Sequence, residues 1–202
     1  MTRVEVRAAG DRGALLEVAD NPAAVRVAQA LRRELDELVD VVPGHRTVLV
    51  TWARDAPAAD LATIAEAALA GAPVPRGRSV ELSVRYDGPD LTAVAGLTGL
   101  SPEEVVARHC GTVYDVSFLG FQPGFGYLLG LDERLVVPRL DEPRTRVPAG
   151  TVAIAGPYSG VYPRESPGGW RLLGRTDAVL FDAARVPPAL LAPGDRVTFV
   201  AQ

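Results

Sequence analysis

The residues best suited to chemistry lie between positions 109 and 131, in a segment that combines glycine with aromatic side chains. At its centre, residues 120–127 read Gly-Phe-Gln-Pro-Gly-Phe-Gly-Tyr. Glycine allows positive φ angles and a close approach of the backbone. The loop is therefore a candidate to hold a planar amide or an anion on main-chain N–H groups, between aromatic walls. The alternative is a tight turn whose aromatic residues belong to the core. The candidate residues of this loop are Phe121, Pro123, Gly124, Phe125 and Tyr127.

Two arginines further along the chain, Arg139 and Arg144, each follow a proline, which keeps the local backbone out of a helix. If residues 140–143 form a turn, both guanidinium groups could point to one site. Arginine there would suit bidentate binding of a carboxylate or a phosphate. The alternative is weak ion pairing at the surface with three nearby carboxylates, those of Asp132, Asp141 and Glu142.

A third candidate segment, residues 156–170, carries aromatic side chains among glycines and prolines. Tyr158 and Tyr162 lie four residues apart, and Gly168 and Gly169 precede Trp170 at the start of a predicted strand. A tryptophan in this position suits the wall of a pocket or the anchor of an interface. The alternative is a core tryptophan that covers one end of a β-barrel.

His109 and Cys110 lie at the end of a predicted helix, where a protonated histidine interacts favourably with the helix dipole. A catalytic Cys–His pair needs proximity in space rather than in sequence, so both residues fit a structural role. His109 is nevertheless kept as a candidate binding or interface residue. With one cysteine and two histidines in the chain, we expect no metal site, and no catalytic residue can be assigned.

The composition excludes several other chemistries. All 21 basic residues of the 202-residue chain are arginines, so no lysine can form a Schiff base or contact ATP phosphates in a P-loop. The formal net charge of -4 argues against nucleic acid or an anionic membrane as the main partner. No signal peptide and no apolar run of membrane-spanning length is evident, so we expect a cytoplasmic protein.

The first part of the chain predicts a small sheet with helices on one face. A helix is expected from Pro22, capped by Asn21, to about Asp40, and a second follows Pro57 and ends at Gly71. The strands are predicted over residues 3–10, 14–19 and 47–52. Residues 71–78 are rich in glycine, proline and arginine and are the best linker candidate. The predicted domains are therefore 1–75, an α+β unit, and 76–202.

The second part predicts short helices followed by a β structure. One helix starts near Asp90, and Ser101 begins a capping box for another that ends near His109. Residues 120–174 then hold ten glycines, seven prolines and six of the twelve aromatic residues, which favours a closed or strongly curved sheet. The strands of this part are predicted over 79–86, 112–119, 150–156, 170–174, 178–182 and 196–202.

Together these motifs resemble the PxpB/KipI family, that is, the 5-oxoprolinase component designated B or allophanate hydrolase subunit 1, with a carboxyltransferase domain of subdomains C and D. The residues that carry the resemblance are His109, Tyr114, 118–131, 137–139, 143–156, 160–176 and 193–199. The resemblance implies an α+β fold, with a small N-terminal α/β sandwich domain and a C-terminal cyclophilin-like β-barrel domain. The chain departs from the family at Tyr158, where we expect glutamine, and in a shortened loop over 86–91.

The resemblance also implies an activity and its partners. It implies one subunit of an ATP-dependent 5-oxoprolinase that opens 5-oxo-L-proline to L-glutamate and is inactive alone. ATP with Mg²⁺ would act at the level of the complex, with Arg139 or Arg144 as a clamp for the substrate carboxylate. The partners would be a larger PxpC/KipA-like companion subunit, similar to allophanate hydrolase subunit 2, and a third PxpA/LamB-like protein. The alternatives are a biotin-carrier-dependent carboxyltransferase subunit of the urea carboxylase type and a KipI-like inhibitor of a sensor histidine kinase.

Overall fold

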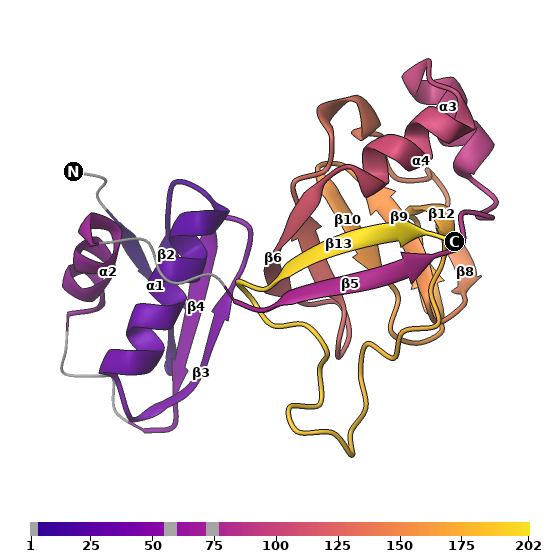
Figure 1. Ribbon diagram of the computed structural model, residues 1–202. Coiled ribbons are helices and arrows are strands. Elements are labelled where there is room, and N and C mark those ends of the chain that lie inside the picture. The colour runs from indigo at the N-terminus through magenta and orange to yellow at the C-terminus, as the bar shows by residue number, and fades with distance from the viewer. Residues whose placement is uncertain (1–3, 55–59, 72–76) are drawn as a thin grey trace. The chain divides into compact units, whose positions relative to one another are not determined.

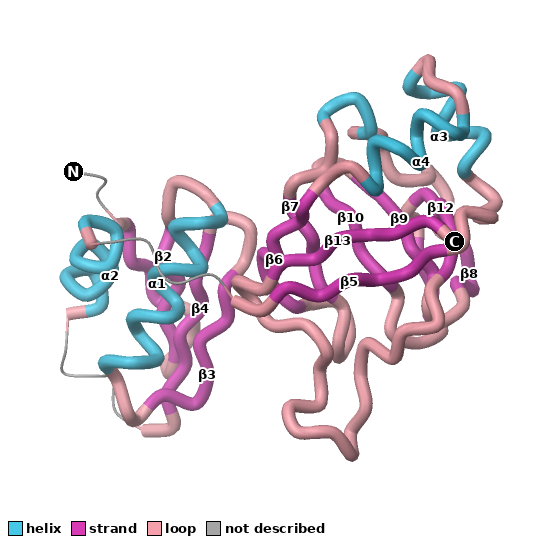
Figure 2. Tube along the Cα trace, in the orientation of Figure 1, coloured by secondary structure: helices cyan, strands magenta, loops and turns pink. Residues whose placement is uncertain are grey.

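Two units of mixed helix and strand make up the chain, Met1–Arg76 and Gly77–Gln202 (Figures 1 and 2). The structure is a computed structural model that describes residues 4–54, 60–71 and 77–202. The predicted α+β class is confirmed. The predicted domain boundary between residues 75 and 76, and most of the predicted linker, lie outside the described residues.

The first unit is a four-stranded antiparallel sheet with strand order β1-β2-β4-β3 and two helices on one face (Figure 1). Alternating residues of the inner strands, such as Leu16, Val48 and Val50, are fully buried against the apolar side of α1. The elements are β1 Glu5–Ala8, β2 Gly13–Glu17, α1 Asn21–Glu34, β3 Leu38–Pro43, β4 Thr47–Trp52 and α2 Leu61–Ala70.

Two details of the first unit differ from the prediction. The cap of α1 is Asp20, whose carboxylate accepts a hydrogen bond from the Ala23 backbone N–H at 2.8 Å, whereas Asn21 is the first helical residue. The helix also ends at Glu34 rather than near Asp40. Residues 38–43 form β3 instead, because pairing with β4 supplies their backbone hydrogen bonds.

The second unit is a seven-stranded, nearly closed sheet with order β12-β9-β10-β7-β6-β13-β5. All neighbours are antiparallel except β13 and β5, which are parallel. The two edge strands approach at Arg85 and Arg175, whose backbones exchange two hydrogen bonds of 2.9 Å and close the ring. The strands are β5 Ser79–Val84, β6 Val113–Leu119, β7 Gly126–Leu129, β8 Arg144–Val147, β9 Thr151–Ala155, β10 Tyr158–Val161, β11 Ser166–Gly168, β12 Arg171–Arg175 and β13 Arg196–Ala201.

Two helices, α3 (Leu91–Thr98) and α4 (Pro102–Cys110), and the short 3-10 helix η1 (Glu133–Leu135) accompany this sheet. The predicted capping box is present at α4, since Ser101 and Glu104 exchange side-chain-to-backbone hydrogen bonds. No described helix has the length and apolarity needed to cross a bilayer; the longest, α1, has 14 residues.

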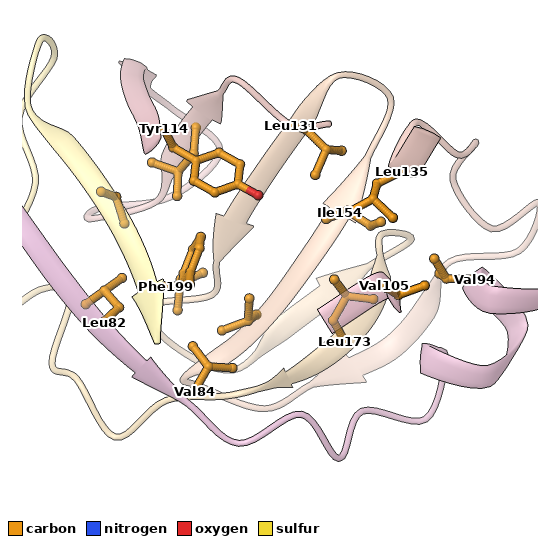
Figure 3. Close-up of a cluster of buried hydrophobic side chains, with 14 of the residues drawn as sticks. Leu82, Val84, Val94, Val105, Tyr114, Leu131, Leu135, Ile154, Leu173 and Phe199 are labelled. Atoms are coloured by element: carbon orange, nitrogen blue, oxygen red, sulfur yellow. The ribbon is translucent and has the colours of Figure 1, made fainter. Parts of the chain in front are cut away.

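The interior of the barrel is filled by side chains from both sheet and helices. Figure 3 shows Leu82 and Val84 of β5 directed toward the same space as Phe199 of β13 and Tyr114 of β6. Val105 of α4 joins this cluster. The barrel centre is therefore a packed core, and any binding site must lie at its rim or on its outer side.

One predicted strand of the second unit is wrong. Residues 178–182 belong to the long segment between β12 and β13, and only the bridge between Phe181 and Ala189 pairs this stretch. Its apolar composition instead reflects a single anchor, Leu180, which is 1% exposed and packs into the barrel core.

Candidate functional site

The glycine-rich loop predicted to carry the site connects β6 to β7. Its backbone is closed on itself, because the N–H of Gly120 donates to the carbonyl of Phe125 at 3.1 Å and the N–H of Phe125 donates to the carbonyl of Gln122 at 3.0 Å. Phe121 has a φ angle of 65°, in the left-handed region that non-glycine residues rarely adopt. This conformation costs about 1–3 kcal/mol. It holds the Phe121 ring outward, where 60% of the residue is exposed.

Gly124 provides the turn that lets the loop pack on the barrel. Its φ angle is 82°, and a Cβ atom at this position would lie 2.7 Å from the Cβ of Phe181. Gln122 fixes the other side of the loop, since its amide oxygen accepts a hydrogen bond of 3.0 Å from Nε of Arg164. Both ends of the strained segment are thus anchored by contacts distant in sequence.

A pocket of about 240 Å³ opens beside this loop, and we call it the aromatic pocket. Phe125 lies at its centre, 1% exposed, with its ring edge-to-face against Tyr127, Tyr162 and Trp170 at centroid distances of 5.2, 5.4 and 5.3 Å. Such arrangements are the preferred geometry of aromatic pairs. The lining residues are Phe121, Phe125, Tyr127, Arg139, Pro143, Tyr162, Pro167, Gly168, Gly169 and Trp170.

Two glycines allow the walls of the aromatic pocket to approach each other. A Cβ atom at Gly168 of β11 would lie 2.2 Å from the hydroxyl oxygen of Tyr162. A Cβ atom at Gly160 of β10 would lie 3.0 Å from the Phe125 ring and 3.1 Å from the Trp170 ring. The pocket shape therefore depends on the absence of side chains at these positions.

Arg139 is the charged group of the aromatic pocket. It is exposed, and within the part of the chain that the structure describes it forms no ion pair or side-chain hydrogen bond. Burial raises the pKa of Tyr127 and of Tyr162, an effect that the positive charge of Arg139 partly opposes in both. Both phenols are consequently neutral at physiological pH and can donate or accept one hydrogen bond.

Eight of the thirteen predicted site residues line this pocket, and the other five do not. Pro123 and Gly124 support the loop behind it. Tyr158 packs edge-to-face on Tyr127 and Phe118, and burial raises its pKa to about 12. The predicted family departure at Tyr158 therefore alters a position beside the pocket and leaves the lining itself unchanged.

Arg144 lies apart from Arg139, so the expectation that both guanidinium groups share one site is wrong. The Nη2 atom of Arg144 donates to Oδ1 of Asp90 at 2.7 Å, and Oδ2 of Asp90 accepts from the Leu172 backbone N–H at 2.7 Å. Asp90 is only 5% exposed. Arg144 thus neutralises a buried carboxylate that ties the start of α3 to β12.

His109 is fully buried and lies outside the aromatic pocket. Its Nδ1 atom is 2.7 Å from the Tyr86 hydroxyl, and its Nε2 atom is 2.8 Å from Oγ of Ser159. Cys110 donates to Tyr86, and Ser159 donates to the carbonyl of Ala153. Tyr86 therefore gives its proton to Nδ1, and Nε2 carries the ring proton. Desolvation lowers the pKa of His109 to about 3, so the ring is neutral and links α4 to β10.

Sequence reasoning missed three contributors: Gln122, which anchors the loop, and Pro143 and Pro167, which line the pocket. Gln122 stands inside the motif singled out from the sequence, so its polar side chain between aromatic residues was the available signal. Among the described residues, no group of three or more His, Cys, Asp or Glu side chains is arranged to hold a metal ion. The lining offers aromatic walls, backbone groups and one arginine, which can bind and orient a small molecule.

Comparison with protein families identifies a match over residues 4–191 to the carboxyltransferase domain, subdomain C and D. The chain is 54% identical over 131 residues to a 5-oxoprolinase subunit, designated B, from Escherichia coli O157:H7, and the match covers 63% of this chain and 60% of that protein. It is 49% identical over 126 residues to the corresponding 5-oxoprolinase subunit from Bacillus subtilis strain 168, covering 61% and 52%. The matches thus span between about half and three fifths of these relatives.

Solved structures show the same fold. The crystal structure of TTHA0988 superposes with a TM-score of 0.79 at 40% identity, covering 98% of this chain and 40% of that chain. The urea carboxylase of Kluyveromyces lactis superposes with a TM-score of 0.74 at 22% identity, covering all of this chain and 22% of that one. In both, the fold of this chain is one part of a longer polypeptide.

Proposed function

The chain belongs to the carboxyltransferase domain, subdomain C and D family, and from this membership we propose that it is one subunit of a multi-subunit 5-oxoprolinase. The overall reaction would open 5-oxo-L-proline to L-glutamate with hydrolysis of ATP. The observation that carries the proposal is the aromatic pocket with an exposed arginine, Arg139, that no carboxylate of the described chain neutralises.

The size and chemistry of the pocket suit a small cyclic amide that carries a carboxylate. Sites for drug-sized ligands occupy roughly 300–1,000 Å³, whereas this pocket has about 240 Å³. The flat lactam ring would pack against the aromatic walls, and its carboxylate would accept hydrogen bonds from Arg139. The neutral phenols of Tyr127 and Tyr162 would be available to the amide group.

The chemistry explains why such a subunit needs both ATP and a companion. A lactam is a poor electrophile, but transfer of a phosphoryl group to its oxygen makes the carbonyl carbon open to attack by water. The ring C–N bond then breaks, its nitrogen becomes the amino group of glutamate, and ATP leaves as ADP and phosphate. The described lining holds no carboxylate, histidine or cysteine that could activate the water. We therefore assign that group to the companion subunit, and Mg²⁺ would arrive with the nucleotide.

The test is turnover by the chain with its larger companion subunit, measured as glutamate formation and as ATP hydrolysis that depends on 5-oxoproline. Loss of a charge-assisted hydrogen bond costs about 1.5–3 kcal/mol. Arg139→Gln should therefore raise the KM for 5-oxoproline about 10- to 100-fold. Arg134→Gln is the matched control, because Arg134 is also exposed and lies on η1, outside this lining. An unchanged KM in Arg139→Gln would remove Arg139 from the proposed site.

The same assay separates the other candidates. Turnover that requires a biotin carrier would support a urea-type carboxyltransferase subunit, with which the fold shared with urea carboxylase is also compatible. No turnover with any companion, together with tight binding to a sensor histidine kinase, would support an inhibitor. Glutamate production dependent on ATP and 5-oxoproline would support the leading proposal.

A further inference from the structure

A second pocket, of about 520 Å³, lies on the barrel unit and shares no lining residue with the aromatic pocket. We call it the arginine pocket. Its walls come from the loop before α3, from β8 and the turn that follows it, and from β12. The lining residues are Asp87, Gly88, Pro89, Arg144, Arg146, Pro148, Ala149, Thr151, Leu172, Gly174 and Arg175.

The charge of this lining is opposite to that of the whole chain. Three guanidinium groups, those of Arg144, Arg146 and Arg175, face one carboxylate, Asp87. The chain as a whole has a formal charge of -4. A concave site with a surplus of positive charge concentrates anions locally.

One of these arginines is held in place before any ligand arrives. Arg144 is paired through Nη2 with the buried carboxylate of Asp90, which is itself fixed by the backbone of Leu172. The Nη1 atom of Arg144 is buried and makes no hydrogen bond within the described chain. An unsatisfied buried donor is unfavourable, and an oxyanion bound beside Arg144 would supply the missing acceptor.

The other two arginines keep most of their donors available. Arg146 uses Nε in an ion pair of 2.6 Å with Glu165, and Arg175 uses Nη2 in an ion pair of 2.6 Å with Asp87. Their side chains are 74% and 58% exposed. Since a guanidinium group has five N–H donors, each arginine can bind a further acceptor without giving up its carboxylate.

We propose that the arginine pocket binds a phosphoryl group, either as inorganic phosphate or as the terminal phosphates of a nucleotide. A phosphate presents more acceptor oxygens and more charge than a carboxylate, which matches several guanidinium groups converging from separate strands. The inference deepens the proposed function and rests on it for the source of the phosphate, because ATP, ADP and phosphate all take part in that reaction.

The test is direct binding to the whole chain without its companion, by isothermal titration calorimetry at low ionic strength. The probes are inorganic phosphate, ADP and ATP, with L-glutamate and 5-oxoproline as carboxylate controls. Saturation by inorganic phosphate would identify a free-phosphate site, and saturation by ADP or ATP alone would identify a nucleotide site. Either result supports the proposal if Arg146→Gln and Arg175→Gln each weaken binding at least about 10-fold and Arg134→Gln does not.

Three results would overturn the proposal: no saturable binding of any phosphate probe, equal weakening by the Arg134→Gln control, or equally tight binding of the carboxylates. Circular dichroism would verify folding of each variant. Arg146→Lys and Arg175→Lys form a second series, which should retain part of the affinity because the charge remains. Turnover by the complex without phosphate binding by this chain would refute only this inference, whereas binding without turnover would refute only the proposed function.

Discussion

The buried histidine makes the stability of the barrel depend on pH. His109 is fully buried between Tyr86 and Ser159 and stacks on Phe199 at a centroid distance of 4.5 Å. Desolvation lowers its pKa from the ordinary value of 6.5 to about 3. Burial raises the pKa of Tyr86 and of Tyr114, so neither neighbouring phenol titrates in the acid range.

The direction of the effect follows from the two protonation equilibria. Above about pH 6.5 the imidazole is neutral in the folded and unfolded chains and contributes nothing. As the pH falls, only the unfolded chain binds the proton until about pH 3, so the unfolded state is favoured. Between about pH 7 and about pH 5, this single group should lower the free energy of unfolding by about 2 kcal/mol.

Urea unfolding monitored by tryptophan fluorescence is the appropriate assay. The two tryptophans lie in different units, Trp52 in β4 and Trp170 beside β12. A Trp52→Phe background therefore leaves Trp170, which is 5% exposed, as the reporter of barrel unfolding. In this background, His109→Gln should lose about 2 kcal/mol less than its parent when the pH is lowered from about 7 to about 5.

The matched control is His45→Gln, because His45 is the second histidine of the chain and lies exposed in the other unit. This variant should keep the full pH dependence of the parent barrel. The reasoning is refuted if His109→Gln and its parent lose the same stability over this pH range. A lower stability of His109→Gln at neutral pH alone would not affect the test, since the readout is the slope.

Two further predictions concern packing and charge. Gly168→Ala should destabilise the barrel by about 1–3 kcal/mol, because its Cβ would meet Tyr162, whereas Gly96→Ala on α3 meets nothing within 4 Å and should be neutral or stabilise slightly; urea midpoints compare the two. Arg144→Gln should cost about 1–3 kcal/mol by leaving Asp90 without its cation. A double-mutant cycle with Asp90→Asn should then show non-additive losses, and additive ones would contradict this role.

Much of the local structure was predictable from short motifs. The capping box at Ser101 correctly placed α4, and eight of the residues singled out from the glycine- and proline-rich segments line the aromatic pocket. Signals of this kind act over a few residues, so they survive without knowledge of the fold. Where local signals compete, the prediction was wrong: the apolar stripe of α1 continues to Leu38 in sequence, but pairing of β3 with β4 ends the helix at Glu34.

The α+β class, the chemistry available to the chain and the segments in which a site can lie were all legible in the sequence, because residue types and turn signals are local properties. The folded barrel was needed to show that Arg139 faces the aromatic pocket while Arg144, five residues later, turns to Asp90. It was equally needed to show that His109 is enclosed against Ser159, fifty positions away in the chain. Such partners are selected by pairing and burial summed over the whole barrel, which no single segment encodes.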